Sequence, residues 1–121
     1  MLQAWRIALG LALAANGLFM LVAPSTWYAL VPTVSGTGPF NAHFVRDIGC
    51  AYIAAGGALL WLARDARAWP AVMAGAVFLV LHAATHAGEY FEGRALWPDV
   101  AVDAVLVFAP AALAIRLGWA R

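Results

Sequence analysis

The chain has 121 residues, of which 65% are hydrophobic and 11% are charged. Soluble domains average about 45–50% apolar and about 25% charged residues, so this composition excludes an ordinary soluble domain and a disordered tail. The net charge is +1, without the basic patch that a nucleic-acid-binding protein needs. A single cysteine excludes intrachain disulfides and multi-cysteine zinc sites. We therefore expect an integral membrane protein surrounded by the lipid bilayer.

The apolar residues fall into four segments separated by helix breakers, which predicts an all-α, four-helix transmembrane bundle. The first segment is longer than the apolar region of a signal peptide, so we interpret it as a retained helix that ends before Pro24. Residues 24–41 then form a loop rich in proline and glycine, in which Trp27 and Tyr28 suit the lipid–water interface. Asn41 is placed to cap the second helix.

The later connections are short, which favours antiparallel neighbours. Residues 64–67 form a polar turn, and Pro70 and Pro98 fit the first turns of the third and fourth helices. Glycines, among them Gly10, Gly49 and Gly56, let helices approach closely. No linker or repeat divides the chain, so we expect one domain over residues 1–121. The predicted helices span about residues 2–23, 42–63, 69–90 and 98–118.

The arginines predict the orientation of the bundle. All seven positively charged residues are arginine, and five of them lie on one side. The positive-inside rule places that side, with both termini, in the cytoplasm. The lysine-free, alanine-rich composition is typical of a bacterial inner membrane protein, so the opposite side is expected to face the periplasm. The five arginines are Arg6, Arg64, Arg67, Arg116 and Arg121.

Polar residues gather at the expected periplasmic end of the helices. Residues four and seven positions apart lie on one face of a helix, because each residue advances by about 100°. Three helices carry such a polar stripe. Polar groups are costly against lipid, so we expect the stripes to face inward and to meet in a wet pocket in the outer third of the bundle. The stripes are His43, Asp47 and Cys50; His82, His86 and Glu89; and Asp99 and Asp103, with Asn16 at a similar depth.

The charges of these stripes do not balance. The four acidic residues outweigh Arg46, the one arginine beside them, so a partly dry site must bind a cation, take up protons or admit water. His82 and His86 form an HxxxH pair, which can share a metal ion on one helical face. The alternative is that the two histidines donate hydrogen bonds to Asp103 or Asp47 across the bundle.

The candidate residues divide by role. Fe, Cu, Mn or Zn suits the imidazole and carboxylate ligands, and ligand type alone does not choose among these metals. Haem held by His82 and another histidine is an alternative that lacks a local signature. We assign His82, His86, Asp103 and His43 as metal ligands and Asp47 and Glu89 as acid–base residues, with Arg46, Asp99, Asn16 and Cys50 supporting them.

The stretch from Asn41 to Tyr52, followed by residues 82–89 and Asp103, resembles small bacterial four-helix membrane proteins of unknown function. In size and topology the chain is similar to the DoxX-like group. This resemblance implies an inner-membrane protein, some relatives of which are associated with redox systems. It implies no catalytic residue, because length and topology carry most of it.

Three functions remain open at this point. The first is a metal-binding membrane protein, with a small oxidoreductase as one form of it. The second is a metal-free acid–base enzyme or a binder of a lipid-like small molecule that enters sideways from the bilayer. The third is an accessory subunit of a larger membrane complex or a homo-oligomer. A transporter is disfavoured because the inner half of the bundle offers no polar route. Whether the chain is an enzyme stays open.

Overall fold

The computed structural model describes residues 1–120, and within this range the only regular structure is helical. Four stretches are long and apolar enough to cross a membrane: Leu2–Val22, Ala42–Leu62, Ala66–Phe91 and Trp97–Trp119. The predicted all-α four-helix bundle is therefore confirmed. Arg121, one of the orientation-setting arginines, lies outside the described residues. The helices are α1 (Leu2–Val22), α2 (Pro24–Leu30), α3 (Ala42–Leu62), α4 (Trp69–Phe91), α5 (Trp97–Asp103) and α6 (Ala109–Trp119), with short turns η1 (Val34–Gly36) and η2 (Ala66–Ala68) and a π-helical turn η3 (Ala104–Phe108).

The predicted loop 24–41 contains more structure than expected. Pro24 ends α1 and at once begins α2, because proline lacks the N–H that a first-turn residue does not need. Trp27 on α2 is half-buried, and its indole N–H donates to the Asn16 side chain over 2.9 Å. Asn41 caps α3 as predicted, since its side chain accepts hydrogen bonds from the backbone N–H groups of His43 and Phe44.

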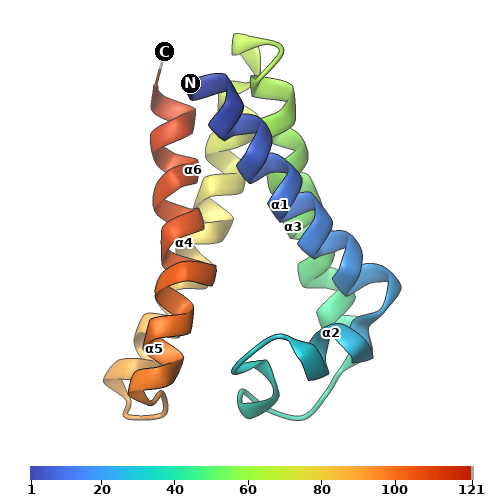
Figure 1. Cartoon of the computed structure of the whole chain (residues 1–121), viewed down its shortest axis with the longest axis vertical. Helices are drawn as coiled ribbons and strands as arrows, with labels where there is room; N and C mark the ends of the chain where they lie inside the picture. Colours follow the sequence, from blue (N-terminus) through green and yellow to red (C-terminus); the bar gives the residue numbers. More distant parts are fainter. Residues whose placement is uncertain (121) are drawn as a thin grey trace.

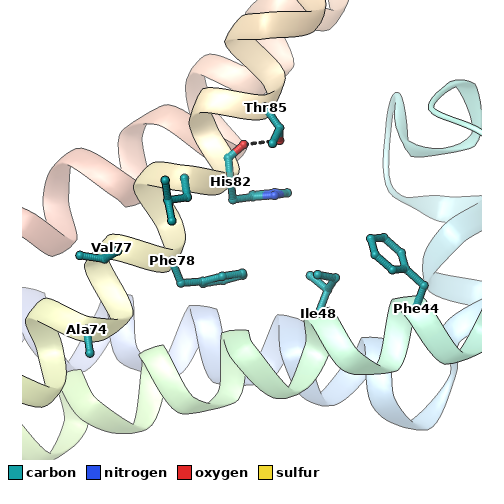
Figure 2. Close-up of a pocket in the computed structure, with 8 residues that line it drawn as sticks. Phe44, Ile48, Ala74, Val77, Phe78, His82 and Thr85 are labelled. Atoms are coloured by element: carbon teal, nitrogen blue, oxygen red, sulfur yellow. Dashed lines mark hydrogen bonds between the residues drawn. The ribbon is translucent and has the colours of Figure 1, made fainter.

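The spans form two pairs, α1 with α3 and α4 with the α5–α6 stretch (Figure 1). The pairs meet near both chain termini and spread apart towards the end where α2 and α5 lie. We call the first end, with η2 and Arg6, the arginine-rich end, and the second end, with His43 and His86, the histidine end. Between the spread pairs, side chains of α3 and α4 face one another across a groove (Figure 2).

Glycines set the contact between α1 and α3. Gly10 lies opposite Gly56 and Gly17 lies opposite Gly49, so both helices carry glycines seven residues apart on the shared face. A Cβ atom on Gly17 would lie 2.4 Å from the Gly49 carbonyl oxygen, and one on Gly56 would lie 2.5 Å from the Gly10 carbonyl oxygen. Helices in lipid associate through such close backbone packing, because apolar burial drives little association there.

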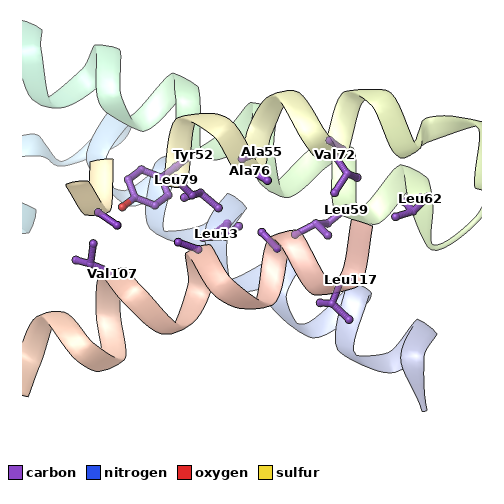
Figure 3. Packing of buried hydrophobic residues seen from close by; sticks show 14 of the residues in the cluster. Leu13, Tyr52, Ala55, Leu59, Leu62, Val72, Ala76, Leu79, Val107 and Leu117 are labelled. Carbon is purple, nitrogen blue, oxygen red and sulfur yellow. The ribbon is translucent and has the colours of Figure 1, made fainter. Parts of the chain in front are cut away.

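The core lies where the two helix pairs meet (Figure 3). Gly75 of α4 packs against Ala55 of α3, and Gly118 of α6 packs against Val72 and Met73 of α4. Leucine, valine and alanine side chains from the spans fill the space between these contacts. The largest fully buried side chains are Met20, Leu59 and Val72.

Two polar side chains of α1 hold the arginine-rich end together. The Gln3 amide donates to the Ala63 carbonyl oxygen at the end of α3, over 2.8 Å. The Arg6 guanidinium donates to the Leu117 carbonyl oxygen, over 3.0 and 3.2 Å, and to that of Ala120. Carbonyl groups in the last turn of a helix lack partners within the helix, so these hydrogen bonds satisfy them and place a cation at the negative end of the α6 dipole.

We predict that Gly56→Ala destabilises the fold and that Gly57→Ala, one residue along α3, does not. The added methyl group at Gly56 meets the α1 backbone, whereas that at Gly57 has no neighbour within 4 Å. Overpacking costs about 1–3 kcal/mol. An exposed glycine-to-alanine change in a helix is neutral or stabilising by up to about 1 kcal/mol. Both variants are compared with the unmodified protein by the free energy of unfolding in mixed detergent micelles. Equal changes in the two variants would contradict the close glycine contact.

Candidate functional site

His86 and Asp103 form a buried hydrogen-bonded pair between α4 and α5. The His86 Nδ1 atom lies 2.8 Å from the Asp103 Oδ2 atom, and the two side chains are 18% and 10% exposed. Asp103 is the one charged residue that is buried among those the structure describes. With Asp103 ionised, Nδ1 of His86 carries the proton and Nε2 is left to accept or release one. The sequence-based alternative, in which both histidines bond to Asp103 or Asp47, is therefore observed for His86 alone; within residues 1–120 His82 has no such hydrogen bond.

The helix that carries Asp103 is irregular immediately after it. Residues Ala104–Phe108 form the π-helical turn η3, and Pro110 follows two residues later. Proline has no N–H to donate, and in an α-helix its ring would collide with the carbonyl group four residues earlier. A π turn relieves that collision, and such turns occur often at functional sites.

His82 lies one turn before His86 and connects the pair to aromatic side chains. Its ring stacks on Phe78, with centroids 6.0 Å apart and planes inclined by 12°. The rings of Tyr52 and His86 lie nearly perpendicular to the His82 ring, at centroid distances of 6.0 and 4.8 Å. Tyr52 comes from α3, so His82 occupies the junction between the two helix pairs.

The groove between α3 and α4 has a volume of about 540 Å³ and reaches His82. Figure 2 shows the His82 ring above Phe78, with Ile48 and Phe44 of α3 across from them. Phe44 and Leu81 are each 62% exposed, so this groove, the α3–α4 groove, opens sideways towards lipid. Its surface is mostly apolar, in contrast to the wet polar pocket that the sequence predicted. It is lined by Phe44, Ile48, Ala74, Val77, Phe78, Leu81, His82 and Thr85.

The polar stripe of α3 does not join this site, which corrects the prediction that three stripes meet. His43 Nε2 lies 3.4 Å from Asp47 Oδ2, but these side chains are 87% and 60% exposed, and Cys50 is exposed as well. The glycine contact with α1 is the reason. The stripe lies roughly 100–160° around the helix axis from Gly49, on the side away from the core. Asp47 is also within about 8 Å of the start of α3, where it can reach the headgroup region.

In the described part of the chain, the side chains of the other predicted site residues make no hydrogen bond to the His86–Asp103 pair. Arg46 donates to the Leu21 carbonyl oxygen over 3.2 Å, and Asp99 accepts from the backbone N–H of Leu96 at the start of α5. Glu89 is half-buried, one turn beyond His86. Within residues 1–120 the structure contains no group of three or more His, Cys, Asp or Glu side chains that could hold a metal ion.

Sequence reasoning missed two aromatic members of the site. Phe78 is four residues before His82, so the helical spacing alone could have placed it on the same face. The sequence gives no comparable indication for Tyr52. This residue is on α3, and only the packing of α3 against α4 brings it next to His82. Asn16 was predicted to lie at the depth of the site. Its side-chain oxygen accepts a hydrogen bond from Trp27 instead of contacting the histidines.

Comparison with known proteins gives no relative. No family model, curated protein or solved structure matches this chain. The similarity to the DoxX-like group stays a prediction from size and topology. The chemistry of the site is therefore inferred from the α3–α4 groove and the His86–Asp103 pair.

We predict that Asp103→Asn destabilises the protein more than Asp47→Asn does. A buried hydrogen bond to a charged group contributes about 1.5–3 kcal/mol, and much of this is lost when the acceptor becomes neutral. An exposed ion pair contributes about 0–1 kcal/mol. A double-mutant cycle with His86→Gln should show coupling between residues 86 and 103, measured as the free energy of unfolding in micelles. Additive effects of the two substitutions would contradict the pair.

Proposed function

We propose that this multi-pass membrane protein binds a lipid-like small molecule in the α3–α4 groove, with the polar head of the ligand at His82. One observation carries the proposal: an apolar groove that opens sideways leads to two adjacent histidines, the second of which is bonded to a buried aspartate. An apolar ligand can enter such a groove from the bilayer without crossing water.

The dimensions and lining of the α3–α4 groove support a small ligand. Ligand sites commonly have volumes of about 300–1,000 Å³, apolar walls and a few polar groups that fix orientation. Here Phe44, Ile48 and Phe78 offer apolar and aromatic contacts. The His82 ring supplies the polar group, and Thr85 lines the same end. A single tail with a hydrogen-bonding head, such as a prenyl alcohol or a quinone, has this distribution of polarity.

The histidines support acid–base chemistry on the bound head group. Asp103 orients His86, the role that a carboxylate plays when it accepts a hydrogen bond from Nδ1. The His82 ring lies between His86 and the α3–α4 groove, so it can hydrogen-bond a hydroxyl or carbonyl oxygen of the ligand. Proton transfer to or from that oxygen, or to a neighbouring double bond, is the reaction class we infer.

The proposal also includes the orientation of the bundle in the membrane. The excess of arginine at the arginine-rich end favours that end in the cytoplasm. The α3–α4 groove would then open into the outer leaflet of a bacterial inner membrane, with His43 and Asp99 near the periplasm.

We predict that Ala74→Phe removes a co-purifying ligand, whereas Ala84→Phe does not. Ala74 lines the α3–α4 groove, and Ala84 is exposed elsewhere on α4. Filling the groove with a ring should weaken binding by about fivefold or more, the effect of an overpacking cost of about 1–3 kcal/mol. Organic extraction and mass spectrometry of protein purified in mild detergent measure the ligand. The proposal fails if no lipid-like molecule is retained, or if both variants retain it equally.

A metal ion held by His82 and His86 is a second candidate, as in an oxidoreductase. The two rings are 4.8 Å apart, and Asp103 bonded to Nδ1 of His86 is the partner that often orients a metal-binding histidine. Asp103 would then support a ligand rather than act as one. The remaining ligands would have to come from water, the substrate or another copy of the chain.

Elemental analysis of protein purified without chelator separates the two candidates. Bound Fe, Cu, Mn or Zn at near-stoichiometric amounts, lost in His82→Ala and in His86→Ala, would support the metal site. We expect little metal, because the described residues offer only two close imidazoles. The His43→Ala variant is the matched control, since His43 lies on the exposed face of α3.

A further inference from the structure

A second groove lies at the arginine-rich end, between the η2 turn and the end of α6. It has a volume of about 740 Å³, and its lining includes Leu62, Arg67, Trp69, Trp119 and Arg6. We call it the basic groove. It is at the opposite end of the bundle from His82, so it is separate from the α3–α4 groove.

Two arginines bring positive charge to the basic groove. The Arg67 side chain is 89% exposed; its Nε and one terminal nitrogen donate to Asp65. These bonds hold the pKa of the Asp65 carboxyl below its usual range, so the pair stays ionised. Arg6 uses Nε and one terminal nitrogen on the end of α6. Within residues 1–120, the second terminal nitrogen of each guanidinium makes no hydrogen bond. It can therefore donate to an additional acceptor.

The charge around the basic groove stays positive after these pairings. Arg6, Arg64, Arg67 and Arg116 lie at this end, and Asp65 is the one acidic residue among the described residues there, which leaves a net charge of +3 from four arginines and one aspartate. Arginine forms planar two-point hydrogen bonds that match a phosphate group.

Two tryptophans fix the depth of the basic groove in the bilayer. Trp69 is the first residue of α4 and Trp119 is the last of α6, and they are 51% and 72% exposed. Exposed tryptophan rings at the ends of membrane spans lie at the level of the lipid headgroups. The arginines that line the same groove are therefore at the depth of lipid phosphates, while Leu62 and Gly118 give it apolar walls.

We propose that the basic groove binds the headgroup of an anionic phospholipid, with its phosphate at Arg67 and Arg6. Basic pockets between membrane helices recognise such headgroups through charge. The apolar walls and the flanking indole rings favour a lipid over free phosphate, because acyl chains can continue along the spans. The proposal is independent of the ligand and the chemistry assigned to the α3–α4 groove.

The test uses native mass spectrometry of the full-length chain with phosphatidylglycerol or phosphatidylcholine added in detergent. We expect tighter binding of phosphatidylglycerol, and a loss of about fivefold in Arg67→Gln, the effect of removing one basic contact. Arg64→Gln is the matched control, since it removes the same charge from an exposed residue three positions away that does not line the groove. We expect it to change the affinity by less than about twofold.

Three results would overturn the proposal. Equal losses in Arg67→Gln and Arg64→Gln would show diffuse attraction to the whole arginine-rich end. Equal binding of the two lipids by the unmodified protein would show that charge is not recognised. Displacement of phosphatidylglycerol by inorganic phosphate at similar concentration, at constant ionic strength, would assign the groove to free phosphate.

Discussion

The close backbone contact between α1 and α3 determines the arrangement of the rest of the molecule. Paired glycines, Gly10 with Gly56 and Gly17 with Gly49, fix both the separation and the rotation of these helices. Once α3 is rotated to place its glycines against α1, its adjacent face, with Tyr52 and Ala55, is available to α4. The polar stripe of α3 is then turned away from the core. In lipid, where apolar burial drives little association, such steric fit is the main determinant of rotation.

The difference between the two ends of the bundle follows from how each is held. At the arginine-rich end, Gln3 and Arg6 bond to the carbonyl groups that end α3 and α6, and Gly118 allows α6 to approach α4. At the histidine end, Trp27 and Asn16 tie α2 to α1, whereas α4 and α5 are held to each other by His86 and Asp103. Within the described residues, no side-chain hydrogen bond joins the two helix pairs at the histidine end. The α3–α4 groove therefore remains between them, and we propose that a lipid-like molecule fills it.

Burial separates Asp103 from the other acidic residues that pair with a charged or titratable partner. Asp103 is removed from both water and lipid, and among the described residues its one hydrogen bond, from His86, offsets the cost of desolvating it. The exposed pairs, His43 with Asp47 and Arg67 with Asp65, remain near the ends of their spans and avoid this cost. The position of this acid next to two histidines is the feature from which we propose proton chemistry.

The sequence by itself determined the four spans, the cap at Asn41, the shared helical face of His82 and His86, and the gathering of polar residues at one end. These features depend on hydropathy, local hydrogen bonding and helical spacing, all of which act within one segment of chain. Only the tertiary structure decided which polar stripes meet, because the rotation of each helix about its axis depends on its neighbours. The glycines indicated where helices can approach closely, but not that α1 and α3 would share this contact. The meeting of Asp103 with His86, and the place of Tyr52 beside His82, were therefore fixed by packing between helices rather than by any local pattern.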